Sequence, residues 1–282
     1  MSSEHAGRHD GGRRETLFDA CRADRFVFRI NRKVEKMKIS RSYAIALILV
    51  SMLFGTSAYA SVTLSGTRVV FPGSEKEATV QLTNDGKLPS LIQAWLDKGD
   101  ERASPDAIDV PFVITPTVFR VEPGKGQTLR ILYTGEPLPA DKESLFWLNV
   151  LDVPPKASDK DGVNRLQFAF RTRIKLMYRP AGLPGNAADA PARLKWTLGA
   201  DDAHRPVLKA TNPTAYVVNL AGVELKSAGK RFTAEFGHVA PGETASFRLT
   251  GASGVDLAGA TVLYSSVDDW GANHSHEAPV SK

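Results

Sequence analysis

The segment from Arg165 to Pro180 constrains the fold more than any other part of the chain, because its side chains alternate with a period of two. Most odd positions are polar or basic, and the even positions Leu166, Phe168, Phe170, Ile174, Leu176 and Tyr178 are apolar. Such alternation places the two sets on opposite faces of a β-strand. Because a usual strand has about five or six residues, we expect one long strand that serves more than one partner. Part of it is a candidate for pairing with another protein.

Short alternating runs separated by turn residues fill the chain before this strand. They are Val62 to Phe71, Ala78 to Thr83, Leu91 to Leu96, Val110 to Ile114, Thr128 to Tyr133, Leu145 to Val153 and the long run, Arg165 to Tyr178. Seven runs at this spacing, without a helical stripe, predict an immunoglobulin-like β-sandwich. The polar segment Lys156 to Asn164 is expected to be a mobile loop that leads into the long strand.

A linker rich in Ala, Gly, Pro and Asn follows, from Ala181 to Pro191. Six further runs come after it: Leu194 to Leu198, Val207 to Ala210, Tyr216 to Leu220, Arg231 to Phe236, Ala245 to Leu249 and Ala260 to Tyr264. They predict a second all-β domain. The expected domains are therefore residues 61–180 and 181–282.

Residues 37–60 have the pattern of a secretory signal peptide. Basic residues precede the apolar run Tyr43 to Phe54, and the small-residue motif Ala58-Tyr59-Ala60 follows it. We expect cleavage before Ser61 and export of the mature chain. An uncleaved membrane anchor is the less favoured alternative, because polar and small residues end the apolar run before the motif. Residues 1–36 are expected to be an upstream extension, disordered or the product of a misassigned start codon.

The basic charge of the chain lies in its first 60 residues. The whole chain has a formal net charge of +5, but from Ser61 onward acidic and basic residues are equal in number. A nucleic-acid partner is therefore not expected. Cys21, the only cysteine, also lies in the part expected to be removed, which leaves no disulfide, thiolate nucleophile or thiolate metal ligand.

No catalytic motif is present in the sequence. It has no G-x-S-x-G, no H-E-x-x-H and no P-loop. His274-Ser275-His276 could hold a metal as a strand pair, but it lies in a polar C-terminal stretch that we interpret as a solvated tail. No catalytic residue, metal site or cofactor is predicted.

The segment from Leu138 to Pro154 resembles, position by position, the signature of periplasmic pilus-assembly chaperones of the PapD type. The resemblance continues, in the order of that family, through Thr67 to Phe71, Leu82 to Asp85, Gln93 to Trp95, Phe119 to Pro123 and Ile174 to Pro180, and more weakly through Asn212 to Thr214 and Asp269 to Gly271. Thr117 departs from this resemblance, since the family usually has a second proline there. The geometry of the turn after Pro116 is therefore not predicted by the resemblance.

The resemblance implies two immunoglobulin-like domains arranged as a boomerang with an interdomain cleft. It also implies a non-enzymatic function without a cofactor. Such chaperones lend the last strand of their first domain to a pilin subunit that lacks its own final strand, and deliver the subunit to an outer-membrane usher. Leu166, Phe168 and Phe170 match the donated positions. No integral membrane segment is expected after signal cleavage.

The resemblance also assigns roles to charged residues inside the strands. The pattern alone favours solvent-facing positions for Arg68 and Lys175, but in the family they match a basic pair that holds the C-terminal carboxylate of the subunit. Glu143, Arg179 and Asp269 match an ion-pair network between the domains. Asp268 remains an alternative to Asp269 in that network.

Two other functions are compatible with parts of the sequence. A secreted two-domain adhesin or binding protein explains the signal peptide and the strands, but not the two basic residues or the apolar triplet. An extracellular hydrolase is further disfavoured by the missing catalytic motifs. The modest length of the loop from Lys156 to Asn164 and the absence of flanking cysteines are typical of the chaperones that assemble rod-like pili.

Overall fold

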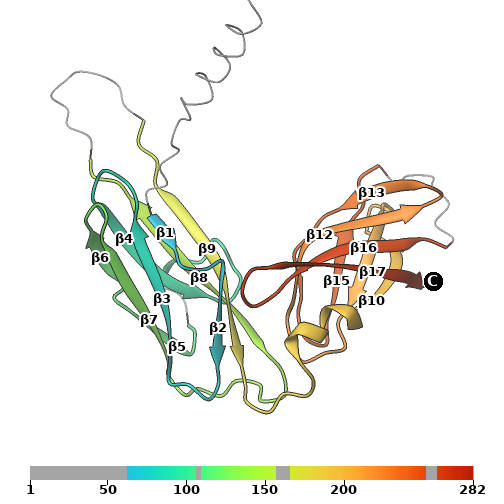
Figure 1. The fold of residues 1–282 in the computed structure, drawn as a ribbon, viewed down its shortest axis with the longest axis horizontal. Coiled ribbons are helices and arrows are strands. Elements are labelled where there is room, and N and C mark those ends of the chain that lie inside the picture. Colours follow the sequence, from blue (N-terminus) through green and yellow to red (C-terminus); the bar gives the residue numbers. More distant parts are fainter. Residues whose placement is uncertain (1–61, 106–108, 157–165, 252–258, 282) are drawn as a thin grey trace, which may run out of the picture. The chain divides into compact units, whose positions relative to one another are not determined.

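The computed structural model describes residues 62–105, 109–156, 166–251 and 259–281 (Figure 1). The predictions for residues 1–36, for the signal peptide at 37–60 and for all but the first residue of the Lys156 to Asn164 loop lie outside these ranges. Within them the chain is built from strands, as expected. No helix in these ranges is long and apolar enough to cross a membrane.

The first group of strands forms two sheets that enclose one apolar core. One sheet has the order β1-β3-β7-β5, with β1 (Val62–Leu64), β3 (Glu77–Asn84), β7 (Gly126–Tyr133) and β5 (Phe112–Thr115). The other has the order β2-β9-β8-β4-β6, with β2 (Arg68–Pro72), β9 (Phe170–Arg179), β8 (Ser144–Val153), β4 (Ser90–Asp97) and β6 (Val118–Val121). Leu82 and Leu129 of the first sheet and Leu148 and Leu176 of the second are fully buried in the core. The predicted sandwich is confirmed.

The first predicted strand, Val62 to Phe71, is in fact two strands in different sheets. β1 pairs with β3, whereas β2 pairs with β9. The alternation shifts its phase between them, since the apolar side chains turned to the core are Val62 and Leu64 in β1 but Val69 and Phe71 in β2. The intervening residues 65–67 carry the chain from one sheet to the other.

The long strand β9 begins at Phe170, not at Arg165 as expected. Residues 166–169 have no regular ladder, because the partner strand β8 ends at Val153 and two prolines without N–H donors follow it. β9 pairs antiparallel with β8 from Phe170 to Tyr178, and parallel with β2 from Lys175 to Arg179. It therefore has two partners, as expected. Residues 170–174 have a described strand on one side only, and we call this part the edge half of β9.

The second group of strands packs around Trp196, Leu208, Leu225 and Val262. It comprises β10 (Lys195–Ala200), β11 (Pro206–Thr211), β12 (Val218–Ser227), β13 (Lys230–Ala234), β14 (His238–Val239), β15 (Thr244–Arg248), β16 (Thr261–Val267) and β17 (Asn273–Ser281). Two single-turn 3₁₀ helices, η3 (Ala187–Asp189) and η4 (Pro191–Arg193), precede it. The second all-β domain is thus confirmed, whereas the boomerang arrangement of the two domains stays a prediction.

The expectation of a solvated C-terminal tail was wrong. Residues Asn273–Ser281 form β17, which pairs antiparallel with β16 and parallel with β10. Its side chains are exposed or half-buried, so the polar sequence does not reveal it. The backbone ladders on both sides hold it in place.

Candidate functional site

Arg68 and Lys175 are directly paired residues of the parallel strands β2 and β9. Both side chains are half-buried. The Nζ of Lys175 lies 5.4 Å from the centre of the Trp147 ring, and the ring of His238 lies 6.0 Å from that of Trp147. Nη1 of Arg68 donates to the carbonyl of Val267 at 3.1 Å, while its buried Nε has no hydrogen-bond partner among the described residues.

Neither cation forms a salt bridge with any residue in the described ranges. Burial, together with the charge of Arg68, lowers the pKa of Lys175 to about 8. Burial also lowers the pKa of Arg68, although Asp268 and Asp269 act in the opposite direction from beyond contact distance. The pKa of His238 falls to about 4 because of burial and of the nearby Lys175. Arg68 and Lys175 therefore form a cationic site that an anion would stabilise.

Arg179, four residues further along β9, has two carboxylate partners. Its Nε donates to Glu143, and its two terminal nitrogens donate to both oxygens of Asp269 at 2.7 and 3.0 Å. The other oxygen of the buried Glu143 accepts from the backbone N–H of Val217 at 2.6 Å. Burial by itself lowers the pKa of Arg179, but the hydrogen bonds to Asp269 and the charge of Glu143 outweigh it and raise the pKa above its ordinary value.

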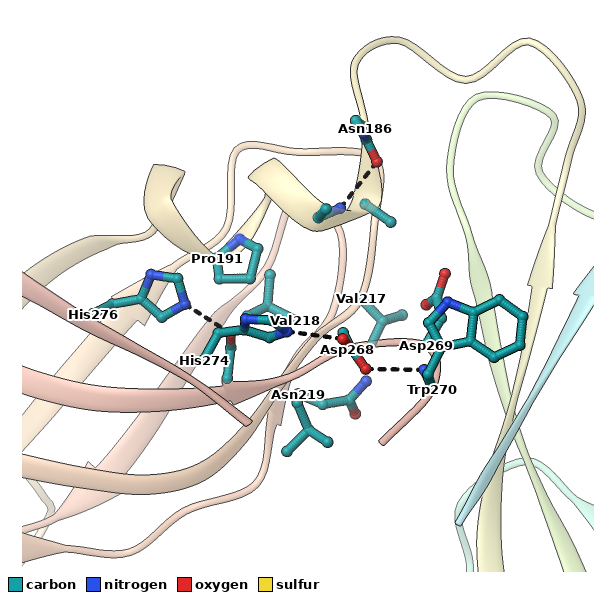
Figure 2. A pocket seen from close by; sticks show the side chains of 14 residues that line it. Asn186, Pro191, Val217, Val218, Asn219, Asp268, Asp269, Trp270, His274 and His276 are labelled. Carbon is teal, nitrogen blue, oxygen red and sulfur yellow. Dashed lines mark hydrogen bonds and ion pairs between the residues drawn. The ribbon is translucent and has the colours of Figure 1, made fainter. Parts of the chain in front are cut away.

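The turn between β16 and β17 separates the roles of two adjacent aspartates. Asp269 contacts Arg179, whereas Asp268 accepts from the backbone N–H groups of Trp270 and Ala272 and pairs with His274 at 2.8 Å. Figure 2 shows the Asp268 carboxylate between the His274 ring and the backbone of Trp270. Asp269, and not the alternative Asp268, is therefore the aspartate that contacts Arg179.

A cavity of about 390 Å³ lies beside this turn. Figure 2 shows the side chains that line it. His274 and His276 both line it from β17, and His276 Nε2 lies 2.8 Å from Ser266 Oγ. Among the described residues no group of three or more His, Cys, Asp or Glu side chains could hold a metal ion.

The apolar triplet is solvent-exposed. Leu166, Phe168 and Phe170 expose 81, 59 and 63% of their surface, and the two phenylalanine rings lie 6.4 Å apart. Phe170 begins the edge half of β9, so exposed apolar side chains occur beside backbone groups that pair with no strand in the described ranges. Such an edge is a template for strand addition and an aggregation hazard when left open.

Two residues beside the cationic pair were not predicted as part of a site. Trp147 lies within the signature segment, but its contact with Lys175 depends on the pairing of β8 with β9. His238 comes from β14 in the second sandwich and had no sequence signal.

The chain matches two family descriptions. Residues 61–184 match "Pili and flagellar-assembly chaperone, PapD N-terminal domain", and residues 189–278 match "Pili assembly chaperone PapD, C-terminal domain". The probable fimbrial chaperone YadV of Escherichia coli K12 is 41% identical over 239 residues, which are 83% of this chain and 96% of YadV. The chaperone protein FimB/FhaD of Bordetella pertussis is 40% identical over 247 residues, which are 86% of this chain and 98% of that protein.

Solved structures agree with these matches. The crystal structure of the YadV chaperone aligns with a TM-score of 0.67 at 38% identity and covers 78% of this chain and all of its own. The SafB chaperone in complex with the SafA pilin of Salmonella enterica aligns with a TM-score of 0.65 at 27% identity, over 80% of this chain and 98% of the other. With both domains matched in sequence and in fold, this chain belongs to the PapD family of pilus-assembly chaperones.

Proposed function

We propose that this protein is a periplasmic, non-enzymatic chaperone that binds fimbrial subunits by donor-strand complementation, keeps them folded and delivers them to an outer-membrane usher. The observation that carries the proposal is the pair Arg68 and Lys175. Two half-buried cations in direct register, with no salt bridge in the described ranges, form a site for an anion. A polypeptide C-terminus supplies a planar carboxylate that two cations can hold by charge-assisted hydrogen bonds.

The exposed triplet supplies the second half of the function. Strand addition by pilus chaperones is an established example of β-augmentation, in which backbone bonds give affinity and alternate side chains give specificity. Each large side chain that enters a groove of the subunit contributes about 1.5 to 3 kcal/mol. Anchoring one end of the subunit strand fixes which of its residues meet Phe168 and Phe170, because a slip by one residue reverses every side chain.

The bridge from Glu143 through Arg179 to Asp269 supports the geometry of the site. Glu143 belongs to the first sandwich, and Asp269 to the second. We assign this network the role of fixing the two domains relative to each other, so that residues of both keep their places around Lys175. Its contribution is to hold the binding site together and not to contact the subunit.

Co-expression in the periplasm with candidate fimbrial subunits tests the capture function. The wild-type protein is expected to co-purify with its subunit, and Phe168→Glu is expected to abolish the complex while shifting the thermal midpoint little, since Phe168 is mostly exposed. Val113→Glu, an equally exposed apolar position on β5, serves as the control and is expected to retain capture. If Phe168→Glu retains capture, or unfolds the domain, the triplet is not a donated segment and the adhesin alternative gains ground.

Export is tested separately. N-terminal sequencing of the protein recovered from periplasm is expected to begin at Ser61. A mature protein that begins within residues 1–36 would contradict the proposed signal peptide.

A further inference from the structure

The odd-numbered side chains of the edge half of β9 are held by their own sheet. The Nε and an Nη of Arg171 donate to the Oδ1 of Asn149 at 2.9 and 2.6 Å. Arg173 donates to both oxygens of Asp97, from Nη2 at 2.6 Å and from Nε at 3.2 Å. Asn149 in turn donates to Asp97 at 2.7 Å. One connected network therefore joins β4, β8 and β9.

Asp97 is the centre of this network. Its side chain is 1% exposed, and it also accepts from the backbone N–H of Gly99 at 2.6 Å. Burial by itself raises the pKa of its carboxyl, but hydrogen bonds from Arg173, Asn149 and Gly99 outweigh this and lower the pKa. The carboxylate is thus charged and compensated, and the network has a buried anion to which both arginines are drawn.

Aromatic rings and a turn hold the two arginines from other sides. The guanidinium of Arg171 lies 5.0 Å from the ring centre of Trp95, and that of Arg173 lies 4.0 Å from the ring centre of Trp147. Both arginines also reach Glu101, Arg171 through the backbone carbonyl at 2.6 Å and Arg173 through the carboxylate at 3.2 Å. Each guanidinium is therefore fixed by hydrogen bonds and by stacking.

The position of this network matters because the edge half of β9 lacks other support. Residues 175–179 lie between β2 and β8 and bury Leu176, Met177 and Tyr178. In contrast, β8 is the one described strand beside residues 170–174, and of their side chains only Ile174 is buried. A strand end with one neighbour and little buried surface frays easily. A frayed strand must be ordered again when a partner binds, which weakens and slows binding.

We propose that Asp97 and Asn149 are positioning residues for subunit capture, which act through Arg171 and Arg173 to hold the edge half of β9 against β8 before a subunit arrives. This inference rests on the proposed function and deepens it. The odd face of the strand is tied to its own sheet, and the even face and the free edge remain available to the subunit.

Amide hydrogen exchange in the free protein, followed residue by residue by NMR, tests the inference without any subunit. Asp97→Asn keeps the shape of the side chain and removes its charge. We expect amides of residues 171–174 that bond to β8 to exchange at least tenfold faster, and those of residues 176–178 to be unchanged. Glu77→Gln removes an exposed carboxylate that pairs with Arg130 across β3 and β7, and it should alter neither region.

Unchanged exchange at residues 171–174, or equal acceleration along all of β9, would overturn the proposal. If Asp97→Asn does not fold, Arg171→Met gives the same test from the exposed side of the network, with faster exchange expected over residues 170–172.

The second arm measures how fast the pilin that co-purifies with the wild-type protein is captured from denaturant. Arg173→Met is expected to slow capture at least fivefold, and Arg173→Lys, which keeps a cation for Asp97, should restore most of the rate. Val80→Ala, a core change in the other sheet, controls for lost stability and should capture at the wild-type rate. A slow Val80→Ala or an unrescued Arg173→Lys would contradict a positioning role. Failure of the wild type to capture any pilin would instead refute the proposed function, and the exchange experiment would still decide this inference.

Discussion

Lys175 and Arg179 are two cations on the same strand, four residues apart, with opposite surroundings. Arg179 contacts two carboxylates, and its pKa lies above the ordinary value. Lys175 has no carboxylate partner in the described ranges, and burial together with the charge of Arg68 lowers its pKa to about 8. A compensated charge belongs to the fold, because its partners are part of the same chain. An uncompensated one weakens the free protein and is best explained by a partner that is still to bind.

Glu143→Ala is expected to have the largest effect and tests the compensated end of the comparison. It removes one of the two anions from Arg179 and also leaves the N–H of Val217 without its acceptor. Breaking a buried pair in this way costs about 3 to 5 kcal/mol of unfolding free energy, measured by urea denaturation. Glu75→Ala, on the exposed surface, should change stability by less than about 0.5 kcal/mol. A loss below about 1 kcal/mol for Glu143→Ala would remove the distinction between the two cations.

Lys175→Ala tests the cation that has no carboxylate partner in the described ranges. It should weaken subunit binding without lowering the free energy of unfolding. Loss of one charge-assisted hydrogen bond weakens subunit binding by about 1.5 to 3 kcal/mol, roughly ten- to 150-fold. Arg68→Ala should behave alike. Unfolding free energy should stay the same or rise, because the remaining cation loses a repulsive neighbour. The exposed Lys195 provides the control, since Lys195→Ala should bind subunit as the wild type does. Wild-type co-purification of either site variant would show that the pair is not the anchor.

The pH dependence caused by Lys175 is the smallest expected effect. It sharpens the comparison with Arg179, because stability should rise and subunit binding should weaken as the pH rises. The pKa of Lys175 is lowered from 10.5 in the unfolded chain to about 8 in the fold, so the unfolded state binds more protons between these values. Its contribution to stability is therefore full above pH 10.5 and is lost as the pH falls to about 8. Subunit binding needs the charged form and should weaken as the pH rises from 7 to 9.

The readout is the difference between the wild type and Lys175→Ala, which removes the titrations of all other groups. Stability of the wild type relative to the variant should rise from pH 8 to pH 10. The dissociation constant of the wild-type complex should increase at least threefold between pH 7 and pH 9, with no such increase for the variant. Parallel pH profiles for the two proteins would place the titrating group elsewhere.

The two sandwiches could be predicted from the sequence because apolar and polar side chains alternate along many of their strands. The division of the first run was also readable in principle, since Val62 and Leu64 occupy even positions and Val69 and Phe71 occupy odd ones. A change of parity within one run means that the two parts face a core from different sheets. β17 was not recognised, because its first residues are polar and only Ala278 and Val280 near its end pack against the core. Its ladders with β16 and β10 place it in the sheet.

The site was only partly predictable for a different reason. The resemblance selected Arg68, Lys175 and Arg179 by their positions in motifs, but nothing in the sequence distinguishes Asp268 from Asp269. The choice between them depends on the turn after β16, where the carboxylate of Asp268 accepts from two backbone N–H groups and Asp269 is left for Arg179. The network around Asp97 was missed because its members lie far apart in the chain and meet only through the register of β4, β8 and β9.

The start of β2 at Arg68 has a geometrical consequence for any guest strand. β2 runs parallel to β9 and first pairs with it at Lys175, so beside residues 170–174 no described strand occupies the position in line with β2. A guest strand with its C-terminus at Lys175 would run parallel to β9. It would lie in line with β2 and pair with the part of β9 that precedes the pairing with β2. This edge is five residues long, which is about 17 Å at roughly 3.3 Å per residue. Where β2 begins would then set the direction of the guest and the point at which it must end.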